Sequence, residues 1–152
     1  MEEMKLLLRA SLPFAILTLA QGQDLPNGPG KEVTTKICGA CHEAGVVVKY
    51  RSSKDDWQGV VEDMRGRGAD GSDDDFKNII NYLSHYFGPE IHINKASAAD
   101  LASQIEISPT EAAVIVQYRD ANGDFKDLPS LQKVPGIDMT KIDPIKQRIV
   151  FN

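Results

Sequence analysis

Two cysteines and a histidine stand close together in the sequence and could carry redox chemistry. They form the run Cys38-Gly39-Ala40-Cys41-His42, in which the imidazole directly follows the second thiol. C-x-x-C-H is the pattern at which c-type haem is attached. At this spacing both thiols can form thioether bonds to the porphyrin edge, while the adjacent imidazole ligates the iron. The motif therefore predicts one covalently bound haem c, held by Cys38 and Cys41, with His42 as the proximal iron ligand.

A pair of cysteines at this spacing also permits two other kinds of site. A redox-active dithiol would use both thiols and leave His42 without a role. A structural zinc site needs four ligands, and the chain has no cysteine besides Cys38 and Cys41. Haem is the preferred interpretation because the N-terminus indicates export, and haem attachment takes place outside the cytoplasm.

The N-terminus has the features of an export signal. Residues 5–20 form an apolar run, shorter than the about 20 residues that a bilayer-spanning helix needs. A small-x-small sequence, typical of a cleavage site, follows at 20–22, and Met4 is the expected true start because the residues before it are acidic. We therefore expect residues 1–22 to be a signal peptide and the protein to be exported to the periplasm. An uncleaved N-terminus that anchors the protein to the membrane is the alternative.

Three helices are predicted to position the motif, after a flexible Pro/Gly-rich linker at residues 23–30. The first helix covers about residues 31–42 and carries the cysteines. The second places four apolar side chains on one face, at offsets of three, four and seven: Trp57, Val60, Val61 and Met64. The third begins at an acidic cluster and ends before a Gly-Pro pair. Together they define a unit over residues 31–88, which is small enough to need additional apolar filling, and a haem would supply it.

The unit at 31–88 resembles a small, single-haem class I cytochrome c. The matching features are the CGACH motif, a methionine on the middle helix followed by a Gly-rich turn, and a final amphipathic helix with the sequence NYL at 81–83. The segment W-x-x-V-V-x-x-M-x-x-x-G is similar to haem-binding segments of some quinohaemoprotein dehydrogenases. The resemblance implies that Met64 is the distal iron ligand. The Gly-Pro-x-Leu segment, whose proline carbonyl commonly orients the proximal imidazole, is missing.

Three further residues enter the predicted haem site with alternatives. Met64 could instead be an ordinary core residue, because methionine often fills gaps in apolar cores. His85 is the alternative distal ligand, since two imidazoles can ligate one haem iron, although a helix histidine beside aromatic residues is more often a surface residue. Arg51 is a candidate for a contact with a haem propionate, because guanidinium groups pair well with carboxylates.

The predicted function is electron transfer, without enzymatic activity. The sequence contains no Ser/His/Asp set and no Gly-rich phosphate loop. An iron with both axial positions filled cannot bind a substrate, so a small-molecule substrate is not expected. The remaining chemistry is transfer of one electron between redox proteins. A periplasmic dehydrogenase or a membrane oxidase would be a suitable donor or acceptor, and the chain could be a subunit of such an oxidoreductase.

A second small helical unit is predicted at residues 92–152, so the expected fold class is all-α. Helices are expected at 97–105, 109–122, 130–134 and 139–149, and no segment shows the alternation typical of strands. Residues 93–137 resemble the paired helix-hairpin-helix module of the DNA-uptake competence protein family. The matching residues include Ile93, Asn94, Ala96, Glu111, Tyr118, Arg119, Asn122, Gly123, Phe125, Val134, Pro135, Gly136 and Ile137.

The sequence lacks the features with which that module would bind DNA. In that family, glycine N–H groups at each hairpin turn bind a phosphate. Here Glu106 and Ser108 replace the glycines of the first turn, and Asp138 replaces the second glycine of the second turn. The net charge is −5, which also disfavours nucleic acid. We therefore expect a docking role for the module. The alternative is a helix-hairpin-helix DNA-binding protein with a structural or sensory haem.

Overall fold

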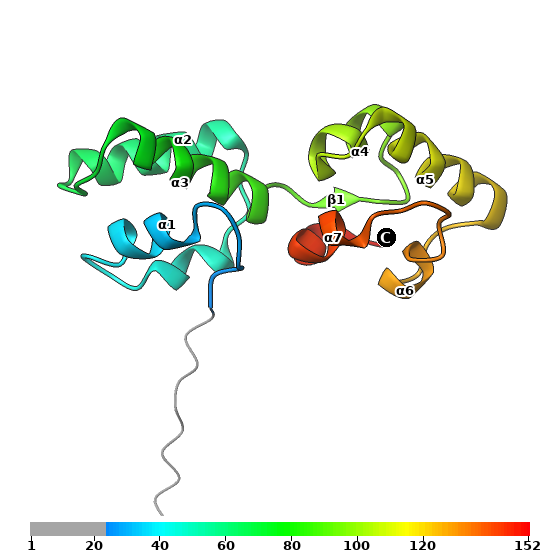
Figure 1. Cartoon of the computed structure of the whole chain (residues 1–152), viewed down its shortest axis with the longest axis horizontal. Coiled ribbons are helices and arrows are strands. Elements are labelled where there is room, and N and C mark those ends of the chain that lie inside the picture. Colours follow the sequence, from blue (N-terminus) through cyan, green and yellow to red (C-terminus); the bar gives the residue numbers. More distant parts are fainter. Residues whose placement is uncertain (1–23) are drawn as a thin grey trace, which may run out of the picture.

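The chain folds into two helical lobes joined by a short segment near β1 (Figure 1). The computed structural model describes residues 24–152, so the predicted signal peptide lies outside the described residues. The all-α prediction is confirmed, because the sheet in this part of the chain consists of two paired strands of two residues each. Among the helices of residues 24–152, none is both long and apolar enough to cross a bilayer.

The first lobe is built around one central helix. Its elements are α1 (Lys31–Cys38), the 3-10 helix η1 (Ala44–Lys49), α2 (Lys54–Gly66) and α3 (Asp73–Tyr86). Capping boxes begin α2 at Ser53 and α3 at Ser72, where each hydroxyl accepts a hydrogen bond from the third residue of the helix. The apolar face of α3 packs against both α1 and α2, so this helix fixes the position of the other two.

The helix that carries the cysteines is shorter than predicted. It ends at Cys38, where the expectation was a helix to about residue 42. Gly39 follows in close contact with the helix, because a Cβ atom there would lie 2.2 Å from the Thr35 carbonyl oxygen. A turn then leads into η1, in a segment for which no element was predicted. The thiol of Cys41 and the imidazole of His42 are therefore carried by a turn and not by a helix.

The segment predicted as a flexible linker at 23–30 is packed, in its described part, against α3. The Tyr82 hydroxyl donates a hydrogen bond to the Pro26 carbonyl at 2.7 Å, and the Tyr86 hydroxyl donates one to the Asn27 carbonyl at 3.0 Å. A Pro/Gly-rich composition indicated flexibility, but these two tyrosines supply donors for backbone carbonyls that have no partner of their own. The linker prediction is corrected accordingly for residues 24–30.

The second lobe contains two pairs of helices and the small sheet. Its elements are β1 (Ile91–His92), α4 (Ala98–Ile105), α5 (Pro109–Asn122), α6 (Leu128–Leu131), α7 (Met139–Ile142), the 3-10 helix η2 (Asp143–Arg148) and β2 (Ile149–Val150). The strands β1 and β2 are parallel. The predicted helix at 139–149 is interrupted, because Pro144 lacks the N–H that would continue α7. The helix predicted at 130–134 begins earlier, at Leu128, because the Asp127 side chain caps it.

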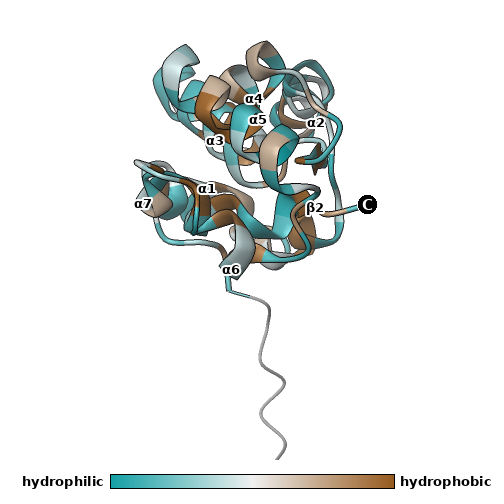
Figure 2. Cartoon of the chain, turned by 90° about the vertical axis from the view of Figure 1, so that its right-hand side faces the viewer, coloured by the Kyte–Doolittle hydropathy of each residue, from teal (hydrophilic) through white to brown (hydrophobic). Residues whose placement is uncertain are grey.

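The buried apolar side chains of both lobes belong to one core cluster. Hydrophobic residues are concentrated on inward-facing parts of the helices and beside β2 (Figure 2). In the second lobe the most deeply buried large side chains are Ile91, Ile93, Leu101, Ile105, Ile115, Leu131, Ile142 and Ile145. In the first lobe they come mainly from α3. The first lobe differs from the second in one respect that bears on function, since a large cavity lies beside its core.

Candidate haem site and hairpin turns

A cavity of about 560 Å³ opens in the first lobe. It lies among the end of α1, the η1 segment, α2 and α3, and its lining is mostly apolar: Ile37, Val46, Val47, Trp57, Val60, Val61, Ala69, Phe76, Ile79 and Leu83. Small-molecule and cofactor sites in proteins commonly have volumes of about 300–1,000 Å³ and apolar walls with a few polar groups. The cavity is therefore of a suitable size and polarity for an apolar cofactor.

Four of the residues predicted to bind the haem line this one cavity. Cys38 comes from the end of α1, Cys41 and His42 from the following turn, and Met64 from α2. Imidazole, thioether and two thiols form the donor set with which c-type haem is held. The fold thus brings Met64 to the motif, from which it is separated by the whole η1 segment and most of α2.

The orientation of His42 suits an iron ligand. Its Nδ1 lies 3.1 Å from the Glu43 carbonyl oxygen. A carbonyl can only accept a hydrogen bond, so Nδ1 carries the hydrogen and Nε2 of the neutral ring keeps its lone pair. Metal-bound histidines commonly donate their other ring N–H in this way. The Glu43 carbonyl therefore fixes the tautomer of the neutral His42 ring. Sequence reasoning had no signal for this contact, because every residue has a carbonyl.

Both cysteines are free thiols in this structure. Cys38 is half-buried, and burial raises the pKa of its thiol, while Cys41 is exposed. The Cys38 sulfur is therefore protonated at neutral pH, so burying it at the cavity wall does not bury a charge. The exposure of Cys41 leaves its sulfur accessible from solvent.

Several apolar side chains at the cavity are exposed to solvent. Val46, Tyr50 and Val60 are 41%, 57% and 45% exposed, and all three line it. Val60 was predicted to lie on the inner face of its helix, together with Trp57 and Val61, which are buried. Exposed apolar side chains that cluster in one place commonly mark a binding site. A planar apolar cofactor in the cavity would cover part of this surface.

Two predicted contacts are not brought to the cavity. Arg51 does not line it, and its Nη1 instead donates hydrogen bonds to the carbonyls of Val48 and Tyr50. Its contact with a haem propionate stays a prediction without structural support. His85, the alternative distal ligand, also lies outside the cavity lining, and its Nδ1 is 3.2 Å from the Glu106 carboxylate of the second lobe. The placement of these residues favours Met64 over His85 as the distal ligand.

The second lobe contains two connections between paired helices, and each includes a residue with a left-handed φ. The first joins α4 to α5 through Glu106, which has a left-handed φ of 62°. The second joins α6 to α7 through Gly136, which has a left-handed φ of 76°. Glutamate carries a Cβ that opposes this conformation, and glycine does not. Both positions nevertheless adopt it, so each connection contains one left-handed residue although the residue types differ.

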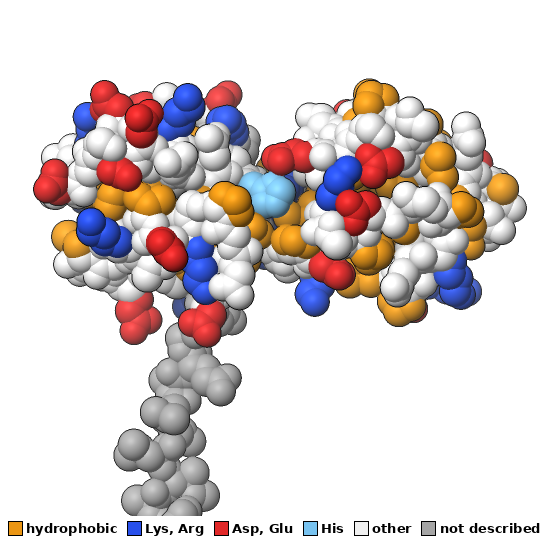
Figure 3. Space-filling view, in the orientation of Figure 1, with side chains coloured by type: hydrophobic (Ala, Val, Ile, Leu, Met, Phe, Trp, Pro, Cys, Tyr) orange, Lys and Arg blue, Asp and Glu red, His pale blue; other side chains and the backbone are white. Residues whose placement is uncertain are grey.

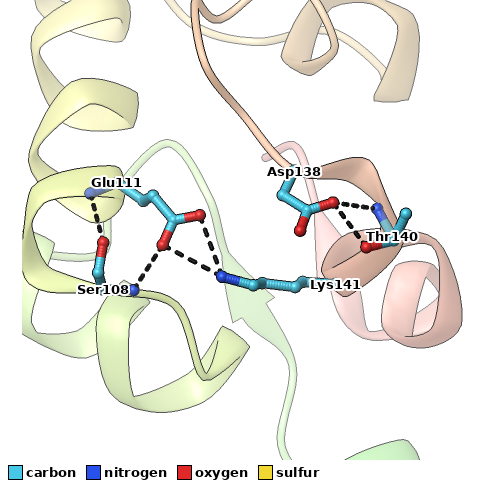
Figure 4. Close-up of polar contacts among 5 residues, drawn as sticks. All are labelled: Ser108, Glu111, Asp138, Thr140 and Lys141. Atoms are coloured by element: carbon cyan, nitrogen blue, oxygen red, sulfur yellow. Dashed lines mark hydrogen bonds and ion pairs between the residues drawn. The ribbon is translucent and has the colours of Figure 1, made fainter.

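Backbone N–H groups that follow these turns donate hydrogen bonds to carboxylates (Figure 4). The Glu111 carboxylate accepts hydrogen bonds from the Ser108 N–H at 2.8 Å and from the Lys141 ammonium at 3.1 Å. The Asp138 carboxylate accepts one from the Thr140 N–H at 3.0 Å and one from its hydroxyl at 2.6 Å. An arriving phosphate would need donors of this kind, and here the chain's own carboxylates already use them.

Comparison with known proteins detects a known motif in the second lobe. Residues 88–150 match the helix-hairpin-helix motif. Over 62 residues the chain is 32% identical to ComE operon protein 1 of Bacillus subtilis, which is 41% of this chain and 30% of that protein. It is also 32% identical over 63 residues to an uncharacterized protein of Haemophilus influenzae, covering 41% of this chain and 56% of that protein. The chain thus spans less than two thirds of either relative. No solved structure matches significantly.

The helix-hairpin-helix match bears out one of the two resemblances. It covers the second lobe and does not include the cavity residues. The hairpins in question are α4–α5 and α6–α7, and Lys141 of the second hairpin reaches Glu111 of the first. This contact holds the two hairpins of the motif against each other.

The Glu111 contacts predict a pH dependence of stability in the helix-hairpin-helix lobe. Hydrogen bonds from the Ser108 backbone, then from its side chain and from Lys141, lower the pKa of Glu111 to about 2 from its ordinary value of 4.5. A lowered carboxyl pKa stabilises the folded state above the ordinary value, and this stabilisation is lost as the pH falls towards the folded value. We therefore expect Glu111→Gln to lower the Tm at pH 7, and the gap from wild type to narrow between about pH 4.5 and about pH 2.

Thermal unfolding followed by circular dichroism across this pH range measures the effect. Asp124→Asn is a matched control, because Asp124 is exposed and lies outside the hairpin contacts. A Tm difference between wild type and Glu111→Gln that stays constant down to pH 2 would contradict the proposed role of the carboxylate.

Proposed function

We propose that the chain is an exported c-type cytochrome that carries single electrons between redox proteins. One haem c would be held through Cys38 and Cys41, and His42 and Met64 would be the protein ligands of its iron. The observation that supports this proposal is that these four residues, drawn from α1, the following turn and α2, line a single apolar cavity. A second supporting observation is the hydrogen bond from His42 to the Glu43 carbonyl, which leaves Nε2 free.

The residues of the cavity have distinct roles in this proposal. Bound haem c supplies a one-electron redox couple. The Glu43 carbonyl keeps the His42 ring in one orientation, and the Met64 thioether would raise the potential of a haem bound there. Buried walls such as Trp57 and Val61 keep water from the ring, and a dry environment also affects the potential. Thioether bonds to both sulfurs would prevent loss of the cofactor after export.

The proposal includes the partners and the compartment. With two protein ligands on the iron no position is left for a substrate, so the chain would exchange electrons with proteins and would not be an enzyme itself. A periplasmic dehydrogenase or a membrane oxidase would suit these roles. The exposed apolar side chains Val46, Tyr50 and Val60 lie at the cavity, where a partner must approach the haem edge. Export rests on the N-terminal residues, which also leave open the membrane-anchored alternative.

A reduced-minus-oxidised visible spectrum tests the proposal. The protein is purified from a host that matures c-type cytochromes, in parallel with a Cys38→Ser/Cys41→Ser variant. We expect haem bands that respond reversibly to oxidation and reduction in the wild type and are absent from the variant. A wild-type protein without redox-active haem bands would refute electron transfer as the function.

A second candidate function is binding of nucleic acid through the helix-hairpin-helix lobe. The match of residues 88–150 to the helix-hairpin-helix motif favours it, and the comparisons with known proteins support this candidate rather than electron transfer. The charges in the structure oppose it. Glu111 and Asp138 place carboxylates at the hairpin turns, and the face drawn in Figure 3 shows acidic and basic side chains interspersed, without a continuous basic patch.

We expect the mature protein not to retard duplex DNA in a gel, even at low salt. Like charges oppose phosphate binding at contact and at a distance. Removing them with Glu111→Gln/Asp138→Asn should increase any residual binding more than the control Asp120→Asn/Asp124→Asn, which changes the net charge equally at other exposed positions. Retardation by the wild-type protein at low salt that weakens as salt is added would instead establish the second candidate.

A further inference from the structure

The segment that links the two lobes is held by an arginine of the second lobe. Arg148, at the end of η2, is 4% exposed. Its Nη1 donates a hydrogen bond to the His85 carbonyl at 2.6 Å, and its Nε donates one to the Pro89 carbonyl at 3.1 Å. Beside it, Gln147 Nε2 donates to the Tyr86 carbonyl at 3.1 Å. The guanidinium thus lies at the C-terminal end of α3, where the helix dipole favours a positive charge.

The same segment holds a wall of the cavity on its other side. The Phe87 carbonyl accepts a hydrogen bond from the Trp57 indole Nε1 at 3.0 Å and another from the Ser52 N–H at 3.0 Å. Trp57 is 3% exposed and lines the cavity. Four of the five carbonyls at 85–89 therefore accept hydrogen bonds, three from the second lobe and that of Phe87 from the first lobe.

Gly88 allows this close contact. A Cβ atom at this position would lie 2.8 Å from Cζ of Arg148 and 2.4 Å from the Ser84 carbonyl oxygen. The arginine therefore rests directly on the backbone of the segment. Immediately after Arg148, Ile149 pairs with Ile91 in the parallel sheet. Residues 148 and 149 therefore contact the segment between the two lobes at two adjoining places.

We propose that Arg148 is a positioning residue for the cavity of the other lobe. It fixes segment 85–89, and the Phe87 carbonyl of this segment in turn sets the indole of Trp57 against the space that the cofactor would fill. The consequence for the haem rests on the proposed function, whereas the hold on Trp57 does not. The helix-hairpin-helix lobe would then contribute to the redox site through a rigid contact, in addition to any docking role.

Trp57 is the only tryptophan in the 152-residue chain, so its indole N–H gives a single resonance in a proton NMR spectrum. The measurement uses the full chain, with the haem iron reduced in protein that carries haem. We expect Arg148→Ala to speed hydrogen exchange at this N–H about tenfold or more. The variant removes charge-assisted hydrogen bonds from the segment that holds the indole. Arg148→Lys keeps a cation but cannot reach both carbonyls in the same way, and should give an intermediate rate. In the haem-loaded protein the midpoint potential should shift in the same order.

Two further variants keep the test decisive. Lys146→Ala, an exposed change on the same 3-10 helix, should alter neither the exchange nor the potential. Gly88→Ala keeps residue 148 as arginine but adds a Cβ atom that displaces its guanidinium. This variant should speed the indole exchange even if Arg148→Ala fails to fold. Unchanged exchange in Gly88→Ala and in folded Arg148 variants would overturn the inference. A protein without haem that still shows faster exchange would refute the proposed function and leave the hold on Trp57 intact.

Discussion

Replacing Met64 by alanine is expected to lower the midpoint potential of the haem and to remove the thioether-to-iron band from the spectrum of the oxidised protein. A methionine ligand opposite histidine raises the potential of a cytochrome, and the fall should be on the order of 0.1 V within the roughly 0.8 V that axial ligands span. Met64 lines the cavity together with His42. Redox titration and visible spectroscopy of the purified, haem-loaded variant measure both effects.

Two controls separate ligation from packing. His85→Ala should leave the band and the potential unchanged, because His85 lies outside the cavity lining and contacts Glu106. Met139→Ala removes a methionine from the second lobe and should also have no effect on the band. If Met64→Ala keeps the band and His85→Ala alters the spectrum, the distal ligand is not Met64 and the imidazole is the better assignment.

Replacing Trp57 by alanine is expected to cause the largest loss of stability among these variants, about 3–5 kcal/mol. The substitution deletes a buried ring that closes one side of the cavity, and it leaves the Phe87 carbonyl without its indole donor. Because the cavity already borders this ring, few side chains are close enough to move into the space that the indole leaves. Urea unfolding of the full chain, followed by circular dichroism, gives the difference in free energy.

The matched control for Trp57 lies one turn further along the same helix. Val60 lines the cavity but is 45% exposed, so Val60→Ala should change the free energy of unfolding by no more than about 0.5 kcal/mol. Trp57→Phe keeps an aromatic ring and loses the hydrogen bond, which should cost about 1 kcal/mol. Equal effects of Trp57→Ala and Val60→Ala would mean that the indole does not support the core of the first lobe.

The parts of the fold that depend on neighbouring residues could be predicted from the sequence. The helix starts at Ser97 and Pro109 were predicted correctly, because a capping serine and a proline in the first turn are local signals. The helix with Trp57 and Met64 followed from its apolar periodicity. The two-residue strands were missed, since a strand of that length shows no alternation and its partner lies almost 60 residues away.

The candidate haem site was predictable in its side chains and not in its backbone. Cys38, Cys41, His42 and Met64 were all identified by residue type, and the structure gathers them at one cavity. The Glu43 carbonyl that orients the imidazole carries no sequence signal. The contact of Arg148 with α3 was missed for a related reason, because its partners are carbonyls more than 50 residues away in the chain.

The sequence showed that the hairpin turns lack several glycines, and the structure shows the contacts that side chains make there. Glu106, Ser108 and Asp138 stand where glycines were expected, which indicated that phosphate binding is lost. The sequence did not reveal that Glu111 bonds to the Ser108 N–H and to Lys141. These contacts link the two hairpins of the motif and use the Ser108 N–H internally.

The mass of the intact, exported protein is the most direct test of the haem assignment. Full-length protein is expressed in a host that matures c-type cytochromes, purified under denaturing conditions that remove non-covalent ligands, and compared with the Cys38→Ser/Cys41→Ser variant. We expect the wild-type polypeptide to carry the additional mass of one haem, and the variant to carry none. Wild-type protein with only the mass of its polypeptide would show that the cavity does not hold a covalent haem.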